Sequence, residues 1–460
     1  MRLIDTLINK YKELPQLQKN IFSGPVYSGF NIVATLIAYP IYLKYLGAEK
    51  YGLWATVTVV LAFSQFGLLG IDNALIKYVA EMYGKKDSKG ITEYVSTSFY
   101  LLLVPSLLVI ILIGIFKTRI VEFLKFKEVF LAEGTRLMFL VTILSIFSLY
   151  VLLVQAIIIG IGRMDIANYS ITISRILQVV LVVSLLIAGC GIWSLYFGFL
   201  FYNIFALLIW IPRLEKVYHI RIFSPLAFKR EKLSQLIKFG GLLSTGRFAN
   251  LFINPFNRVI IARYVGLSEV TYFEIALRVV LAIRTFFSKG LVAILPIISE
   301  IQSRAVDSIK PYISIHKKGM RFILCWASPL FLLVFVFANP ILKYWLGAEF
   351  DIQIAQVLRI LLLGWFLNLL IVPDYLMFLG FGKVSYSVGE EWIKAVVNFF
   401  VIMILIFANI DMSLTKVAIV NTVSFVAGFV YLKYQYFRFL NNPKAILTYG
   451  KDAAQSVDLV

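Results

Sequence analysis

Long apolar runs separated by short polar segments repeat along the whole chain. The first run, residues 20–43, contains no charged residue. At 1.5 Å per residue, a helix of this length crosses a hydrocarbon core of about 30 Å. Applied to the whole chain, the same rule predicts spans near 20–43, 52–77, 94–116, 136–160, 165–188, 191–212, 235–262, 267–297, 320–340, 354–380, 384–409 and 414–437. We therefore expect an all-α polytopic membrane protein with about 12 transmembrane helices.

Composition agrees with this pattern. The chain is 60% hydrophobic and 15% charged, whereas soluble globular proteins have about 45–50% apolar and about 25% charged residues. The net charge of +19 comes from 44 Lys and Arg against 25 Asp and Glu. Most basic residues outside the spans fall on the side that holds the N-terminus, so the positive-inside rule places both termini in the cytoplasm. This bias accounts for most of the charge, and we expect no nucleic-acid partner.

Motifs for catalysis or metal binding are missing from the sequence. Cys190 and Cys325 lie inside apolar runs, with no Cys or His at metal-ligand spacing, and we interpret both as packing residues. There is no P-loop and no Ser-His-Asp arrangement, and His219 and His316 are expected in cytoplasmic loops. We therefore expect no cofactor, no metal and no enzymatic activity.

Two segments recur at nearly the same shift. Lys44-Tyr45-Leu46-Gly47 returns as Arg263-Tyr264-Val265-Gly266, 219 residues later (263 minus 44), and Gly160-Ile161-Gly162-Arg163 returns as Gly380-Phe381-Gly382-Lys383, 220 residues later (380 minus 160). Each repeat contains six spans. Because six is an even number, the two halves have the same orientation in the membrane. Two parallel six-helix lobes around a central cavity suggest an alternating-access transporter. The predicted parts are lobes at 1–215 and 239–440, a basic linker at 216–238 and a cytoplasmic tail at 441–460.

The seventh span carries charged and amide side chains that would be costly in lipid. On one continuous helix at 100° per residue, these positions lie within about 100° of arc and form a single polar stripe. The stripe consists of Arg247, Asn250, Asn254, Asn257 and Arg258. The alternative is that the arginines extend toward opposite membrane interfaces, which suits Arg258 better than the mid-span Arg247.

The eighth span adds Glu274 and Arg278, which at i and i+4 can neutralise each other, and Arg284 near mid-helix. Guanidiniums on neighbouring helices form a permanently charged receptor suited to phosphate or pyrophosphate. The predicted pyrophosphate-binding residues are Arg247, Arg258, Arg278 and Arg284.

In the first half of the chain, uncharged polar groups occupy the positions that correspond in the repeat to the polar and charged residues of the seventh and eighth spans. We therefore expect one wall of the cavity to form hydrogen bonds and the other to be cationic. The predicted polar wall consists of Ser28, Asn31, Thr35, Tyr39, Gln65, Asn250, Asn254 and Asn257. The candidates for ion coupling are Asp72, Glu274 and Asp374, although Asp72 could instead orient a helix end. Four further cations are expected near span ends, reaching the interface: Arg136, Arg175, Arg359 and Lys394.

Several longer segments resemble the polysaccharide-flippase branch of the multidrug/oligosaccharidyl-lipid/polysaccharide exporter superfamily, over nearly the whole chain. They are Tyr45-Leu46-Gly47-Ala48-Glu49-Lys50-Tyr51-Gly52, Gly67-Leu68-Leu69-Gly70-Ile71-Asp72-Asn73-Ala74-Leu75-Ile76-Lys77-Tyr78, Gln155-Ala156 with Gly160-Ile161-Gly162-Arg163, and Tyr344-Trp345-Leu346-Gly347-Ala348-Glu349-Phe350. The resemblance implies two helical lobes. It also implies translocation of an undecaprenyl-pyrophosphate-linked sugar unit across the bacterial inner membrane, as in O-antigen or capsule assembly.

The expected partners are thus the lipid-linked oligosaccharide, membrane lipids, and the polymerase and chain-length proteins of polysaccharide assembly. Three rival functions stay open: a cation-coupled multidrug antiporter of the same superfamily, a membrane scaffold for assembly enzymes, and a membrane glycosyltransferase or ligase. A drug exporter is expected to hold a carboxylate in its first span, which this chain lacks. Peptidoglycan-precursor flippases usually carry helices beyond twelve, for which we find no room.

Overall fold

A computed structural model describes residues 15–66, 68, 70–218, 220, 227–292, 294, 297–298, 301 and 309–441, and these form helices and turns with no strand among them. The all-α prediction is confirmed. His219 and all but the first residue of the predicted tail lie outside the described residues. The chain divides into two compact units, 1–244 and 245–460.

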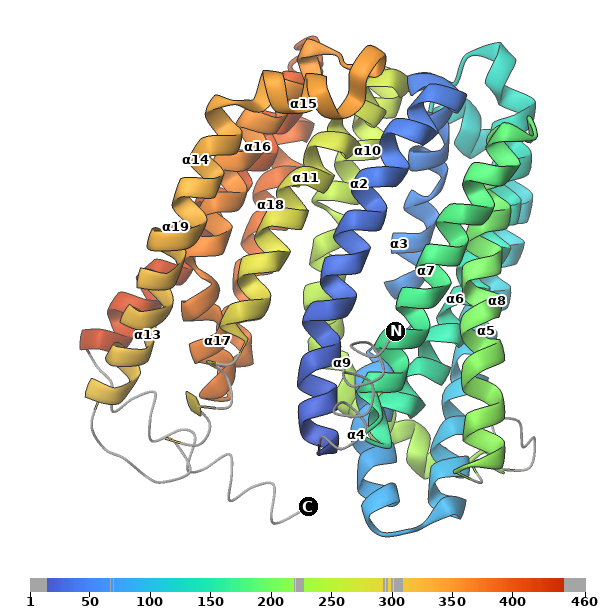
Figure 1. Cartoon of the computed structure of the whole chain (residues 1–460), viewed down its shortest axis with the longest axis vertical. Coiled ribbons are helices and arrows are strands. Elements are labelled where there is room, and N and C mark those ends of the chain that lie inside the picture. The colour runs from blue at the N-terminus through green and yellow to red at the C-terminus, as the bar shows by residue number, and fades with distance from the viewer. Residues whose placement is uncertain are drawn as a thin grey trace, which may run out of the picture. The chain divides into compact units, whose positions relative to one another are not determined.

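The helices of the first unit run along the chain in the order expected from the apolar runs, with the long ones side by side (Figure 1). They are α2 (Gln16–Val57), α3 (Val59–Phe66), α4 (Ile71–Gly84), α5 (Ser88–Phe123), α6 (Glu128–Gly160), α7 (Met164–Ile187), α8 (Trp193–Lys216) and the first part of α9 (Arg230–Leu251).

The second unit contains the rest of α9 and a further set of helices, several of them interrupted. They are α10 (Asn254–Tyr264), α11 (Leu267–Leu291), α13 (Lys310–Phe322), the π-helix η2 (Ile323–Ala327), α14 (Ser328–Val336), α15 (Ala338–Leu346), the 3-10 turn η3 (Gly347–Glu349), α16 (Ile352–Leu370), α17 (Val372–Gly380), α18 (Val384–Phe407) and α19 (Leu414–Asn441).

Eight helical stretches among the described residues are long and apolar enough to cross a membrane by length and composition. The remaining predicted spans, 52–77, 235–262, 267–297 and 384–409, are either broken or charged. The second span is divided among the end of α2, α3 and α4, and the seventh between α9 and α10. The eighth and eleventh, α11 and α18, are continuous but carry several charged residues. Each of these four predicted spans therefore has the length to cross a membrane but contains helix breaks or several charged side chains.

Glycines with positive φ end corresponding helices in both units. Gly47 has a φ of 72° and its counterpart in the repeat, Gly266, a φ of 152°. Gly162 and Gly382, in the turns after α6 and α17, have φ values of 80° and 72°. Only glycine adopts these angles at low cost. The repeated motifs therefore mark the same backbone turns in the two units.

Close helix packing organises the first unit. A Cβ on Gly198 of α8 would lie 2.1 Å from Cγ2 of Val182 on α7, so these helices approach to a distance that only glycine permits. Small residues have this role in membrane proteins, where lipid supplies no hydrophobic force between helices. The core of the unit is built from α4, α5, α6 and α8 around Leu75, Leu102 and Trp210.

Two predictions about single residues are wrong. Cys190 and Cys325 are exposed on the protein surface, so neither is a packing residue. Cys190 lies in the turn after α7, and Cys325 lies in η2, where the interrupted helix turns it outward. His316 is buried on helix α13 and does not lie in a loop.

Candidate functional site

The predicted stripe on the seventh span is interrupted. The helix stops at Leu251 and restarts at Asn254, with Ile253 at φ −108° and ψ −102° between them. Pro255 lies in the first turn of α10, where its missing N–H breaks no helical hydrogen bond. The prediction of one continuous stripe is therefore wrong, because the 100° periodicity does not carry across the break. Arg247 and Asn250 are exposed on α9, whereas the other three positions belong to α10.

The amides on α10 pair with other helices of the second unit. Asn257 is fully buried, and the Asn398 side-chain N–H donates to Oδ1 of Asn257 at 2.8 Å. Asn421 of α19 donates to Oδ1 of Asn254 at 3.3 Å. Asn257 thus holds α10 against α18, and its burial contradicts a place on an open cavity wall.

Arg258 and Arg278 share one buried carboxylate. A terminal nitrogen of Arg258 lies 2.6 Å from Oε2 of Glu274, and Nε of Arg278 lies 2.7 Å from Oε1. The side chain of Glu274 is only 3% exposed, while that of Arg278 is 46% exposed. The predicted pairing of Glu274 with Arg278 is confirmed, and Arg258 joins it from the neighbouring helix. The three charges sum to +1.

Arg284 has a different environment on the same helix. Its Nε donates to Oδ1 of Asn368 on α16 at 3.2 Å, and its guanidinium lies 6.0 Å from the ring centre of Trp365. Among the residues that the structure describes, no carboxylate lies within ion-pair distance of Arg284. The guanidinium of Arg284 therefore contacts the neutral amide of Asn368 and lies near the ring of Trp365.

A cluster on α18 was missed in the sequence. Lys394 is 3% exposed and lies 3.0 Å from Glu390 and 2.9 Å from Glu391. Gly428 of α19 leaves room for it, since a Cβ there would lie 2.9 Å from Oε1 of Glu390. The prediction that Lys394 reaches the interface is wrong, because its carboxylate partners hold it inside the unit. Two adjacent glutamates in an apolar span were the signal that could have revealed the cluster.

Asp374 is a further buried carboxylate of the second unit. It is fully buried and accepts contacts from His316 Nε2 at 3.0 Å and Lys433 Nζ at 2.6 Å. These partners come from α13 and α19, while Asp374 is on α17. The arrangement joins three helices, so the carboxylate predicted as an ion-coupling candidate also has a clear packing role.

The predicted polar wall in the first unit lies along α2, with Gln65 on α3, and its α2 part is only partly accessible. Ser28 and Asn31 are half-buried, whereas Tyr39 is buried with its ring 5.4 Å from that of Tyr51. Thr35 donates to the carbonyl oxygen of Asn31 on its own helix. The side chain of Gln65 lies outside the described residues. Asp72 is half-buried and lies in the first turn of α4. A carboxylate at this position stabilises the helix through its N-terminal dipole.

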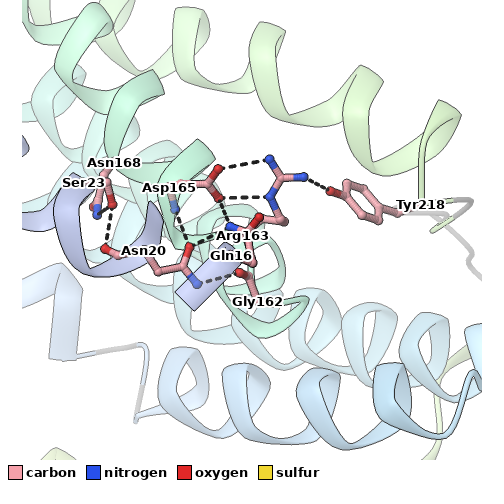
Figure 2. Close-up of polar contacts among 8 residues, drawn as sticks. All are labelled: Gln16, Asn20, Ser23, Gly162, Arg163, Asp165, Asn168 and Tyr218. Atoms are coloured by element: carbon pink, nitrogen blue, oxygen red, sulfur yellow. Dashed lines mark hydrogen bonds and ion pairs between the residues drawn. The ribbon is translucent and has the colours of Figure 1, made fainter. Parts of the chain in front are cut away.

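A polar network anchors the start of α2 to the turn between α6 and α7 (Figure 2). Arg163 forms two contacts with Asp165, at 3.0 and 3.1 Å, and donates to the Tyr218 hydroxyl at 2.9 Å. The hydrogen bond to Asp165 raises the pKa of Arg163. From α2, Gln16 donates to Asp165 at 2.8 Å and Asn20 donates to the carbonyl of Gly162 at 2.8 Å. The network fixes the end of the helix that carries Ser28 and Asn31.

The sequence profile of a family described as "Polysaccharide biosynthesis protein" matches residues 44–355. The chain belongs to this polysaccharide biosynthesis protein family. A Shigella flexneri protein named as a candidate O-antigen transporter is 22% identical over 360 residues, covering 76% of this chain and 82% of that protein.

Solved structures of flippases and transporters share the fold of this family member. The inward closed conformation of the lipid II flippase MurJ has a TM-score of 0.68 at 13% identity, covering 89% of this chain and 86% of that chain. The multidrug transporter DinF-BH has a TM-score of 0.63 at 17% identity, covering 93% and 96%. A MOP superfamily transporter from Pyrococcus furiosus has a TM-score of 0.58 at 15% identity, covering 90% and 95%. The fold is thus that of multi-pass membrane transporters with about 12 helices.

Proposed function

We propose that this member of the polysaccharide biosynthesis protein family is a flippase for an undecaprenyl-pyrophosphate-linked oligosaccharide repeat unit. It would move the unit across the bacterial inner membrane by alternating access, for O-antigen, capsule or exopolysaccharide assembly. Family membership and the flippase-like fold support a lipid-linked cargo. The proposal places both termini in the cytoplasm, and the polymerase and chain-length proteins as later partners.

The environment of Arg284 carries the proposal. A permanent positive charge near the middle of a membrane helix is costly, and it is kept where it pairs with another group or binds an ion or substrate. The contacts of Arg284 are a neutral amide and an indole ring. Glu390 and Glu391 lie near enough to act on it electrostatically, but both are bonded to Lys394. An anionic cargo would supply the missing contact charge, and pyrophosphate matches the fork of a guanidinium.

The other predicted ligands have graded roles in this proposal. Arg278 and the exposed Arg247 would meet the pyrophosphate, and Arg258 would hold Glu274 and orient Arg278. Half-buried groups on α2, such as Ser28 and Asn31, would bind sugar hydroxyls. Glu274 and Asp374, together with Asp72, stay candidates for ion coupling.

The test is transport in proteoliposomes with a fluorescent undecaprenyl-pyrophosphate oligosaccharide. Arg284→Ala should lower the flipping rate at least about tenfold, since a hydrogen bond to a charged group contributes about 1.5–3 kcal/mol. Arg247→Ala combined with Arg284→Ala should abolish flipping. Arg438→Ala removes an exposed arginine from the end of α19 and is the matched control, with an unchanged rate.

The rival functions predict other results. A drug antiporter would accumulate cationic dyes and leave the lipid-linked cargo in place. If the protein were a scaffold, cells that carry the double variant would assemble as much surface polysaccharide as cells that carry the wild type. Normal flipping by the folded double variant would contradict the role of the arginines.

A further inference from the structure

Helix α13 carries a cationic stripe that the proposed transport site does not use. Basic and hydroxyl side chains recur at positions 310, 314, 317, 318 and 321. At 100° per residue, these positions fall within about 100° of arc. All five side chains are exposed: Lys310, Ser314, Lys317, Lys318 and Arg321.

The opposite face of the helix is locked into the second unit. His316 contacts the buried Asp374, and its ring stacks on Tyr436 with the ring centres 4.2 Å apart. Tyr312 is 1% exposed and packs edge-on against Phe381. The helix cannot turn its basic face inward without losing these contacts, so the stripe is held facing outward.

The stripe borders a hollow rich in positive charge. A cavity of about 450 Å³ is lined by Lys310, Ile313, Ser314, Lys317, Lys318 and Arg321. No acidic side chain is among these lining residues. Lys317, Lys318 and Arg321 form no ion pair with any residue in the described part of the chain. These three cations, with Lys310 on the same face of the helix, favour a ligand with more than one negative charge or with several anionic groups.

An exposed apolar surface begins where the stripe ends. Leu324 is 53% exposed and Trp326 is 68% exposed, both in η2, directly after Arg321. The same helical stretch, Lys310–Val336, is apolar enough to enter a membrane. Tryptophan is enriched where a membrane helix meets the headgroup region. Cations and exposed apolar side chains thus follow one another along one helix. This order matches an amphiphile, whose anionic head would contact the cations and whose apolar tail would contact the apolar side chains.

We propose that α13 and η2 form a binding site for anionic membrane phospholipid. The phosphate of the headgroup binds the stripe of Lys310, Lys317, Lys318 and Arg321, and the acyl chains lie along Leu324 and Trp326. This site is separate in sequence and helix from the arginines of α9, α10 and α11 assigned to the cargo. Binding of phospholipid at this site does not require that the protein transports the proposed cargo.

The test is native mass spectrometry of the full chain, released from detergent after incubation with phosphatidylglycerol or with phosphatidylcholine. The variant Lys310→Gln/Lys317→Gln/Lys318→Gln/Arg321→Gln removes the stripe. Retention of phosphatidylglycerol should fall at least about tenfold, because each cation near a membrane surface adds to the attraction for anionic lipid. Retention of phosphatidylcholine should be unchanged.

The control is Lys86→Gln/Lys89→Gln/Lys229→Gln/Arg230→Gln, which removes four exposed cations from the first unit. It should retain phosphatidylglycerol within about twofold of the wild type, since it alters net charge equally without touching the stripe. An equal loss in this control would overturn the proposal, because the effect would then be one of net charge.

Two further measurements separate the remaining outcomes. Lys310→Arg/Lys317→Arg/Lys318→Arg keeps the charges and should keep the lipid, even if the neutral variant proves unstable. Undecaprenyl pyrophosphate is added as a competitor. If it displaces phosphatidylglycerol at equal concentration from wild type, the stripe belongs to the cargo and the phospholipid assignment is wrong. If phosphatidylglycerol remains bound, the assignment is supported.

Discussion

Single charged residues in the second unit are held in sets whose charges largely cancel. Glu274 contacts two arginines, Asp374 contacts Lys433, and Lys394 contacts two glutamates. A buried charge without a partner would cost several kcal/mol in desolvation, so each carboxylate is placed within reach of a cation. Arg284 departs from this rule in its contacts, and this departure supports the proposal that it binds an anionic cargo.

The α18 cluster gives a stability prediction at the residue scale. Lys394→Met leaves the buried Glu390 and the half-buried Glu391 without their cation, and should lower the free energy of unfolding by about 3–5 kcal/mol. The measurement is thermal unfolding of the detergent-solubilised protein, which should show a clearly lower midpoint.

The companion variant is Lys394→Met/Glu390→Gln/Glu391→Gln. With all three charges removed, most of the lost stability should return, because no unpaired charge remains within the cluster. An unfolding midpoint for Lys394→Met equal to that of wild type would show that the cluster contributes no stability.

At the scale of elements, the break between α9 and α10 is stabilised from another helix. Interrupting a helix exposes backbone groups that need new partners. The Asn398 side chain supplies one, since it donates to the carbonyl oxygen of Phe252 at 2.9 Å and also to Asn257. The break is therefore built into the contact between α10 and α18.

Asn398→Ala should destabilise this break. Removing the amide leaves the Phe252 carbonyl and the buried Asn257 without a donor, at a cost of about 1–3 kcal/mol. Hydrogen exchange should rise at residues 250–257. Val396→Ala, at a position 44% exposed on the same helix, is the control and should leave the exchange unchanged. Equal exchange in all three proteins would contradict a stabilising role for Asn398.

At the scale of the whole molecule, the sidedness of the chain can be tested with its own cysteines. With a cytoplasmic N-terminus, the turn after the fifth span faces the periplasm, and the exposed Cys190 lies in that turn. In Cys325→Ser, we expect a membrane-impermeant maleimide to label Cys190 in intact spheroplasts.

A cytoplasmic site provides the comparison. Lys86→Cys, placed in a background with both natural cysteines changed to Ser, lies in the exposed turn between α4 and α5. It should react only after permeabilisation. The reverse pattern of labelling would invert the predicted topology.

Much of the fold could be predicted because its determinants are local. Apolar length predicted the spans, and repeated glycine motifs at 47 and 266 and at 162 and 382 marked the same turns in both halves. The pairing of Glu274 with Arg278 also followed from spacing on one helix. The position of Lys394 near the end of its span predicted that it reaches the interface, whereas its contacts with Glu390 and Glu391 hold it inside the unit.

The sequence by itself determined the membrane class, the order of the helices, the repeat and the family resemblance, since these depend on hydrophobic length and on motifs within one segment. The tertiary structure decided which polar residues face one another. Only packing placed Arg258 beside Glu274, Arg284 beside Asn368, Asn257 inside the contact with α18, and the basic face of α13 outward. Helix periodicity says which residues share a face of one helix, but it does not say which neighbour that face meets or where the helix breaks.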